Sequence, residues 1–102
     1  MSDAFVAVLR IDLHFPEAGS LKAKRAELNA VKAGLRQRCG LAVAEVAHQD
    51  SWQRSTLLAS CCAGTEHGAG ELTDGARRWL DSRLPQGVSV ERRVASWTDL
   101  EG

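Results

Sequence analysis

The chain concentrates its most varied set of polar and aromatic side chains in one short stretch, residues 43–57. There an imidazole, a carboxylate, an indole, an amide and a guanidinium lie in or beside a predicted turn. These side chains form a candidate recognition edge and belong to His48, Asp50, Trp52, Gln53 and Arg54. An indole can stack on a nucleobase or pack on a protein, and a guanidinium can bind phosphate or carboxylate. The stretch therefore predicts a surface that recognises RNA or a protein.

The same stretch also has a purely structural interpretation. Asp50 can hydrogen-bond neighbouring backbone groups and fix the turn, while Trp52 can cover the edge of the core. Glu45 can pair with Arg54 across two strands, an ion pair that contributes about 1 kcal/mol or less when exposed. Both interpretations stay open on the sequence alone.

Basic residues form a second candidate site, on a helix predicted from about residue 21 to residue 38. They recur at helical spacing away from the apolar stripe, and Glu27 is the only acid within the helix. The preceding segment 14–20 offers backbone N–H groups and the positive end of the helix dipole, which suit a phosphate or carboxylate. The predicted RNA- or anion-binding residues are Ser20, Lys22, Lys24, Arg25, Lys32 and Arg36. The alternative is an ordinary solvated helix face.

Catalysis and metal binding find little support in the residue spacing. A nucleophilic enzyme needs a Ser or Cys within reach of a base. Cys61 and Cys62 instead point to opposite faces of a predicted strand, and we interpret both as buried structural thiols. The candidate metal ligands would be His14, Glu45, His48 and Asp50. Because their spacing matches no metal-binding motif, we predict no catalytic residue, no metal and no cofactor.

The apolar periodicity predicts strands and helices in the order β-α-β-β-α-β. The predicted elements are a strand at 5–15, a helix at about 21–38, strands at 41–48 and 53–62, a helix after residue 65, and a strand at 88–97. Ser20 and Thr65 are predicted N-caps, and Gly40 is expected to end the first helix. The residues of the second helix that are expected to face the core are Ala69, Leu72, Ala76, Trp79, Leu80 and Leu84. Residues 98–102 are expected to form a polar tail.

This order predicts an α+β ferredoxin-like sandwich, with a four-stranded antiparallel sheet and both helices on one face. The length of 102 residues suits one domain, so we assign residues 1–102 to a single domain. The uncovered face of the first strand would carry Val6, Val8, Arg10, Asp12 and His14. Its two valines could seed a homodimer. It lacks the aromatic residues on which RNA-recognition motifs stack bases.

Charge and cysteine content indicate the cellular setting. The formal net charge is zero, but residues 1–40 hold seven basic and four acidic residues and residues 41–102 hold six and nine. This asymmetry is more typical of a protein with one anion-binding surface than of a protein that coats nucleic acid. Three cysteines without a paired motif are typical of a reducing compartment, and neither a signal peptide nor a membrane span is expected. We predict a cytoplasmic protein.

Two blocks of the sequence carry a resemblance to a known family. They are His14-x-Pro16 with Ser20-Leu21-Lys22-x-Lys24-Arg25, and Val43-Ala44-Glu45-Val46 followed by Asp50-x-Trp52-Gln53-Arg54. In order, spacing and overall length the chain resembles the YlxP family, small bacterial proteins labelled as being of unknown function. The resemblance implies a ferredoxin-like fold. In many bacteria such proteins are encoded beside translation initiation factor two and the ribosome-binding factor RbfA, which implies a role near ribosome assembly or translation.

Together these observations predict a non-enzymatic factor in ribosome maturation or translation. Its expected partner is ribosomal RNA or the small ribosomal subunit, bound through the basic helix and the recognition edge. The alternative is a homodimeric module that binds a small anion or a protein, using the start of the helix and His14. A small anion would then raise the melting temperature without any RNA.

Overall fold

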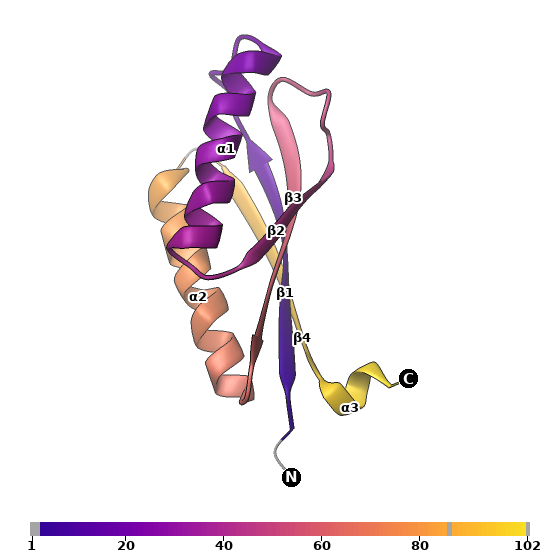
Figure 1. The fold of residues 1–102 in the computed structure, drawn as a ribbon. Coiled ribbons are helices and arrows are strands. Elements are labelled where there is room, and N and C mark those ends of the chain that lie inside the picture. The colour runs from indigo at the N-terminus through magenta and orange to yellow at the C-terminus, as the bar shows by residue number, and fades with distance from the viewer. Residues whose placement is uncertain (1–2, 86, 102) are drawn as a thin grey trace.

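The computed structural model describes residues 3–85 and 87–101. The elements are β1 (Phe5–His14), α1 (Leu21–Gln37), β2 (Ala42–Ala47), β3 (Arg54–Ala63), α2 (Glu66–Arg83), β4 (Val88–Ser96) and α3 (Trp97–Leu100). The strands form one antiparallel sheet in the order β2-β3-β1-β4. Both long helices, α1 and α2, cover the same face of this sheet (Figure 1). The predicted ferredoxin-like arrangement is thereby confirmed.

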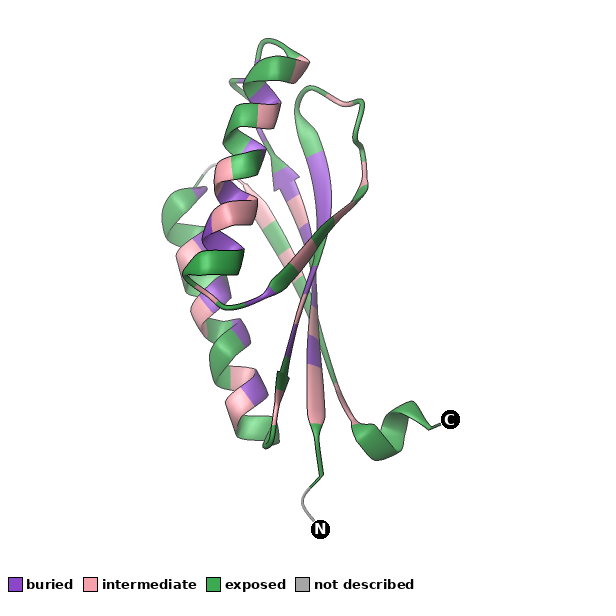
Figure 2. Ribbon diagram, viewed as in Figure 1, coloured by how far each residue is buried: buried purple, intermediate pink, exposed green. Residues whose placement is uncertain are grey.

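The core lies between the two long helices and the sheet, where Figure 2 shows most of the buried positions. On β1 the odd-numbered residues Ala7, Leu9, Ile11 and Leu13 are at most 2% exposed, while the even-numbered residues between them keep contact with solvent. Burying one face of a strand requires this alternation, because successive side chains point to opposite sides. The even-numbered residues therefore lie on the open face of the sheet, as predicted.

Both long helices begin at the predicted caps. The Ser20 hydroxyl accepts a hydrogen bond from the backbone N–H of Ala23 (3.0 Å), and the Thr65 hydroxyl accepts one from Gly68 (2.9 Å). These bonds satisfy N–H groups that have no partner within the helix. After α1, Gly40 adopts a positive φ of 71°, a left-handed conformation that glycine enters without strain.

The core face of α2 differs from the prediction at Leu72, which is 41% exposed. Thr73 occupies the core position instead, one turn beyond Ala69. Its hydroxyl donates to the Ala69 carbonyl (3.0 Å), so a polar side chain can be buried there without an unpaired group. Hydrophobicity alone favours Leu72 for this place, and the placement of Leu72 in the core was wrong.

The indole ring of Trp79 on α2 reaches across to Gly34 of α1. Trp79 is half-buried and lies so near Gly34 that a side-chain carbon on Gly34 would overlap the indole ring. Glycine is therefore needed at this position of α1 because of contact with another helix. Its backbone conformation there is ordinary helix.

The C-terminal segment is more ordered than predicted. β4 ends at Ser96, and Trp97 starts the helix α3 in place of a polar tail. Ser96 and Asp99 form a capping box, in which each side chain accepts the other's backbone N–H at 3.0 Å. The Trp97 N–H donates to the Ala4 carbonyl (2.7 Å), which ties α3 to the start of β1. The expected tail at 98–102 was wrong for residues 98–100, and Gly102 lies outside the described residues.

Candidate functional site

Lys24, a predicted RNA contact, is fully buried. Its ammonium group donates to the backbone carbonyls of His48 (2.7 Å) and Gln49 (3.5 Å) in the loop between β2 and β3. Burial lowers the pKa of Lys24, although the neighbouring Glu45 carboxylate acts in the opposite direction. Lys24 therefore fastens the β2–β3 loop to α1. Its prediction as a surface contact was wrong, because the core-facing side of α1 includes this residue.

Arg25, a second predicted RNA contact, is engaged by the same loop. One terminal nitrogen donates to Glu45 (2.7 Å) and the other to the carbonyl of Gln49 (3.1 Å). Glu45 lies on the helix-covered face of the sheet, where it pairs in register with Leu57 of β3. Arg54 pairs in register with His14 of β1 and lies on the open face. The predicted pairing of Glu45 with Arg54 is therefore wrong, and Arg25 takes the place of Arg54.

The Glu45 carboxylate is the centre of this network. Ser55 donates its hydroxyl to Glu45 at 3.1 Å, and the Lys24 ammonium lies 4.0 Å away. Burial acts to raise the pKa of Glu45, but the hydrogen bonds from Arg25 and Ser55 and the two positive charges outweigh it. The pKa therefore lies below its ordinary value of 4.5, and Glu45 is ionised at neutral pH.

This lowered pKa predicts an acid-dependent loss of stability. The unfolded chain binds a proton at Glu45 near pH 4.5, whereas the folded protein takes it up only at lower pH. The stabilisation is thus complete above pH 4.5 and is lost as the pH falls through the folded-state pKa. In urea unfolding between pH 6 and pH 3, Glu45→Gln is expected to lose less stability on acidification than the wild type. Equal slopes for the two proteins would contradict the assignment.

The structure divides the predicted recognition edge into a loop part and a strand part. The loop part holds Trp52, which is 56% exposed and does not cover the core edge as the structural interpretation expected. Gln53 joins this loop to the segment before α1, because its side chain donates to the Pro16 carbonyl (3.3 Å) and its backbone carbonyl accepts from Phe15 (2.8 Å). Trp52 is therefore presented on an anchored loop beside the start of α1.

The remaining recognition-edge residues have different surroundings. The turn is closed by a backbone hydrogen bond from Ser51 to His48 (3.1 Å), with His48 at a positive φ of 64°. The Asp50 side chain is exposed and makes no hydrogen bond within the described residues, so it does not fix the turn as expected. Arg54 begins β3 beside His14 on the open face of the sheet.

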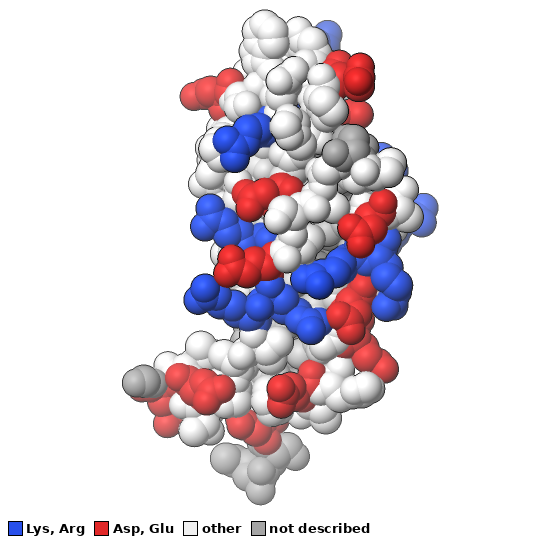
Figure 3. Space-filling model, turned by 180° about the vertical axis from the view of Figure 1, so that it is seen from behind, with Lys and Arg blue, Asp and Glu red and all other residues white. Residues whose placement is uncertain are grey.

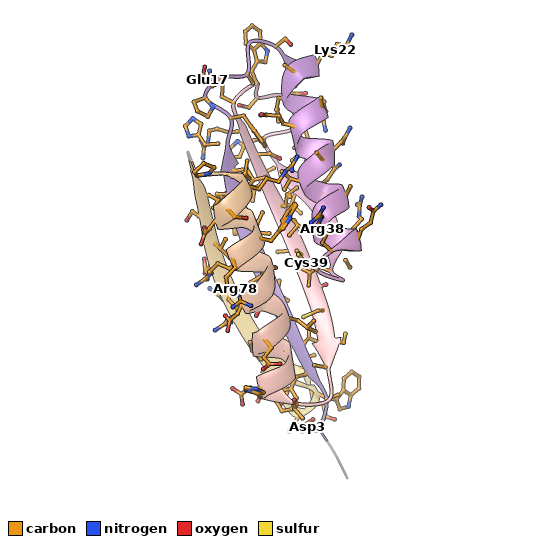
Figure 4. All side chains as sticks on the ribbon, turned by 90° about the vertical axis from the view of Figure 1, so that its left-hand side faces the viewer. Asp3, Glu17, Lys22, Arg38, Cys39 and Arg78 are labelled. Atoms are coloured by element: carbon orange, nitrogen blue, oxygen red, sulfur yellow. The ribbon has the colours of Figure 1, made fainter. Side chains whose placement is uncertain are left out.

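Three basic residues of α1 lie outside the Glu45 network and are reached by solvent. Lys22 and Arg36 are exposed and Lys32 is partly exposed. Arg36 also donates to the Val43 carbonyl of β2 (3.0 Å), which places this side of α1 along that edge strand. Figure 4 shows Lys22 projecting outward from the first turn of α1. Ser20, also predicted to bind an anion, uses its hydroxyl to cap the helix.

The adjacent cysteines of β3 differ in burial. Cys61 is buried, and burial raises the pKa of its thiol, but Cys62 is exposed, so its prediction as a buried thiol was wrong. Within residues 3–85 and 87–101, no group of three His, Cys, Asp or Glu residues is arranged to hold a metal ion. Over the same residues, no helix has the length and hydropathy needed to cross a membrane.

The molecule has a strong charge polarity along its long axis. All thirteen Lys and Arg residues lie in residues 10–59 and 77–93, together with seven acids. The opposite end, residues 3–9, 60–76 and 94–101, has no Lys or Arg and is called the acidic end. Its acids are Asp3, Glu66, Glu71, Asp74, Asp99 and Glu101. Figure 3 shows blue side chains gathered across the middle of one face and only red ones below them.

Sequence reasoning missed this polarity because it compared halves of the chain. Strand pairing brings Phe5, Ala63 and Ser96 side by side, so three segments distant in sequence meet at one end. The signal was present as three stretches without Lys or Arg, but their proximity follows from the sheet topology.

Comparisons with known proteins agree with the fold. The family model described as "Protein of unknown function (DUF503)" matches residues 6–94. No curated protein matches the chain significantly. The chain is similar to the de novo designed protein Foldit4, with a TM-score of 0.55 and 14% identity over 90% of this chain and 96% of that chain. It is also similar to CrmK, a flavoenzyme of caerulomycin biosynthesis, with a TM-score of 0.56 and 20% identity over 93% of this chain but 20% of that one. At such identities the likeness shows the fold alone.

Proposed function

The chain belongs to DUF503, a family of proteins of unknown function, and we propose that it is a non-enzymatic factor that binds structured RNA through α1 and the β2–β3 loop. The observation that carries the proposal is the exposed basic side of α1 beside an anchored, exposed indole. Lys22, Lys32 and Arg36 supply the positive charge, and Trp52 supplies the aromatic surface.

Phosphate contacts account for most of the expected affinity. Cations on a helix can follow an RNA backbone, because each replaces counterions condensed on the phosphates. The acidic end of the molecule repels the same backbone, so it orients α1 and the loop toward the RNA. Binding of this kind is weakly sequence-specific and falls steeply with salt.

The β2–β3 loop adds a contact of a different type. Lys24, Arg25 and Gln53 hold this loop to α1 and to the preceding segment. Trp52 is therefore pre-organised to stack on an unpaired base, which costs less conformational entropy than ordering a mobile loop. Base stacking on an aromatic residue contributes about 1–3 kcal/mol.

We further propose that the bound RNA is ribosomal, with the small subunit as partner. Support for this finer statement comes from the resemblance to the YlxP family and its genetic neighbourhood. The cytoplasm is the compartment in which such a partner is found.

Charge reversal on α1 tests the proposal. Lys22→Glu/Lys32→Glu is expected to reduce co-sedimentation with ribosomal particles by about tenfold or more at low salt, because it turns two attractive phosphate contacts into repulsive ones. The matched control is Arg77→Glu/Arg78→Glu, which makes the same change of net charge at two exposed positions of α2, a helix that the proposed RNA contact does not use (Arg78 is labelled in Figure 4). Sucrose-gradient sedimentation at low and moderate salt, with circular dichroism to verify folding, provides the measurement.

Two results would contradict the proposal. One is a wild-type protein confined to the top of the gradient at both salt concentrations. The other is equal loss of binding in the α1 variant and the control, because a nonspecific effect of net charge would then explain the result.

A further inference from the structure

The open face of the sheet holds a second surface, which RNA binding through α1 does not use. Val8, Arg10, Leu58, Glu91 and Arg93 line a hollow of about 310 Å³ there. The two aliphatic side chains give it an apolar part, and Glu91 is paired with Arg93 (3.2 Å). Arg10 is exposed and makes no ion pair within the described residues. The hollow thus combines an apolar surface with one uncompensated positive charge.

The helix α3 carries the complementary chemistry. Trp97 is 63% exposed and Leu100 is 55% exposed, and their spacing of three residues places them on one side of the helix. Glu101 follows one turn after Trp97 and is exposed. The capping box and the bond from Trp97 to Ala4 hold α3 in place. Figures 1 and 4 both show α3 on the side of the sheet opposite α1 and α2.

We propose that the open face binds a second copy of this chain, with α3 of each protomer lying in the hollow of its partner. The contact is isologous, so each interaction occurs twice about a two-fold axis. Trp97 and Leu100 contact the partner's Val8 and Leu58, and Glu101 pairs with the partner's Arg10.

The strand register determines where this axis lies. Val6 is opposite Cys62 on one side and Ala95 on the other, so these three residues form a row across the open face. The Val8–Arg93 pair lies two residues, about 7 Å, to one side of this row, and α3 begins two residues to the other side. An axis along the row therefore superposes α3 of one protomer on the hollow of the other. The row itself contains no charge, so no like charges meet on the axis.

The charge distribution supports a second copy as the occupant. The charged residues that line the hollow, Arg10, Glu91 and Arg93, carry a net positive charge, whereas α3 lies in the acidic end. Packing about the Val6 row brings Asp99 and Glu101, in and just after α3 of each protomer, toward Arg93 and Arg10 of the other. The formal charge of the chain is zero, so two copies do not repel one another through net charge.

Reciprocal charge reversal is the decisive experiment, and it uses the full chain without RNA. Sedimentation equilibrium of the wild type is expected to show a dimer whose dissociation constant rises with salt. Arg10→Glu alone and Glu101→Arg alone are each expected to raise that constant about tenfold or more. The combined variant is expected to recover most of the lost affinity, because the pair is restored with its charges exchanged. Arg78→Glu on α2 is the control and should leave the dimer unchanged.

A thiol cross-link locates the axis independently. In a Cys39→Ser/Cys61→Ser protein the exposed Cys62 is the only thiol, and it lies in the row of the axis. A short bis-maleimide is expected to join two such chains at concentrations where the dimer forms, and addition of Arg10→Glu should abolish the product. A monomer at all accessible concentrations, a dimer insensitive to both single reversals, or a failure of the combined variant to recover would each overturn the proposal. RNA binding is measured separately, so failure of the dimer leaves the α1 result intact.

Discussion

Replacing Glu45 with alanine is expected to lower the free energy of unfolding by about 2–3 kcal/mol. The reason is that Lys24 would stay buried with its charge but without its carboxylate neighbour, while Arg25 and Ser55 would each lose a hydrogen-bond acceptor. Breaking a fully buried ion pair costs roughly 3–5 kcal/mol. The expected cost is smaller here because the Arg25 side chain is 38% exposed and water can solvate it.

Urea unfolding at pH 7 measures this loss. The urea concentration at the midpoint should fall, while the slope of the unfolding free energy against urea concentration stays the same. Glu17→Ala, in an exposed loop, is the matched control for removing one carboxylate and is expected to change stability by about 0.5 kcal/mol or less. Lys24→Met should cost less stability in the Glu45→Ala protein than in the wild type, because the two side chains belong to one network. If Glu45→Ala proves as stable as Glu17→Ala, the network is not what holds the loop.

Replacing Gly34 with alanine is expected to destabilise the protein by about 1–2 kcal/mol, although alanine is the better helix former. The gain in helix propensity is up to about 1 kcal/mol. The new methyl group would overlap the Trp79 ring, and this opposes the gain in helix propensity. Overpacking of this kind costs about 1–3 kcal/mol. The steric term should win because Trp79 is large and its ring contacts α1 directly.

The control for this substitution is Gly70→Ala in α2. A side-chain carbon at Gly70 meets no atom within 4 Å, so only the propensity term acts and stability is expected to rise by up to about 1 kcal/mol. The opposite signs of two identical substitutions distinguish packing from propensity. Trp79→Leu should reduce the cost of Gly34→Ala in a double-mutant cycle. Equal stabilisation by both glycine substitutions would show that the helices do not approach as described.

Local sequence signals were sufficient for most of the fold. The alternation along β1 specified a half-buried strand, since a strand exposes every second residue. Ser20 and Thr65 specified the beginnings of the two long helices, because their hydroxyls satisfy backbone N–H groups a few residues away. Such interactions span four residues or fewer, so they can be recognised without a tertiary structure.

The candidate site was only partly predictable. The basic character of α1 and the exposure of the loop that carries Trp52 follow from residue type and position. The sequence does not show which basic side chains of α1 are left to bind a partner. Lys24 and Arg25 bond to the β2–β3 loop, more than twenty residues away in the chain. The same limit explains why Glu45 was assigned to Arg54: the register of β2 against α1 cannot be derived from either segment alone.

The sequence by itself determined which segments become helices and strands, where the helices begin, and that one sheet face stays open. Only the tertiary structure decided which charged residues are used internally and that three separated stretches without Lys or Arg meet at one acidic end. It also decided that α3 lies beside the open face, although the capping box of Ser96 and Asp99 that starts this helix is a local signal. The physical reason is one of range: periodicity and capping act within a few residues, whereas ion pairs and surface charge depend on distances set by the completed sheet.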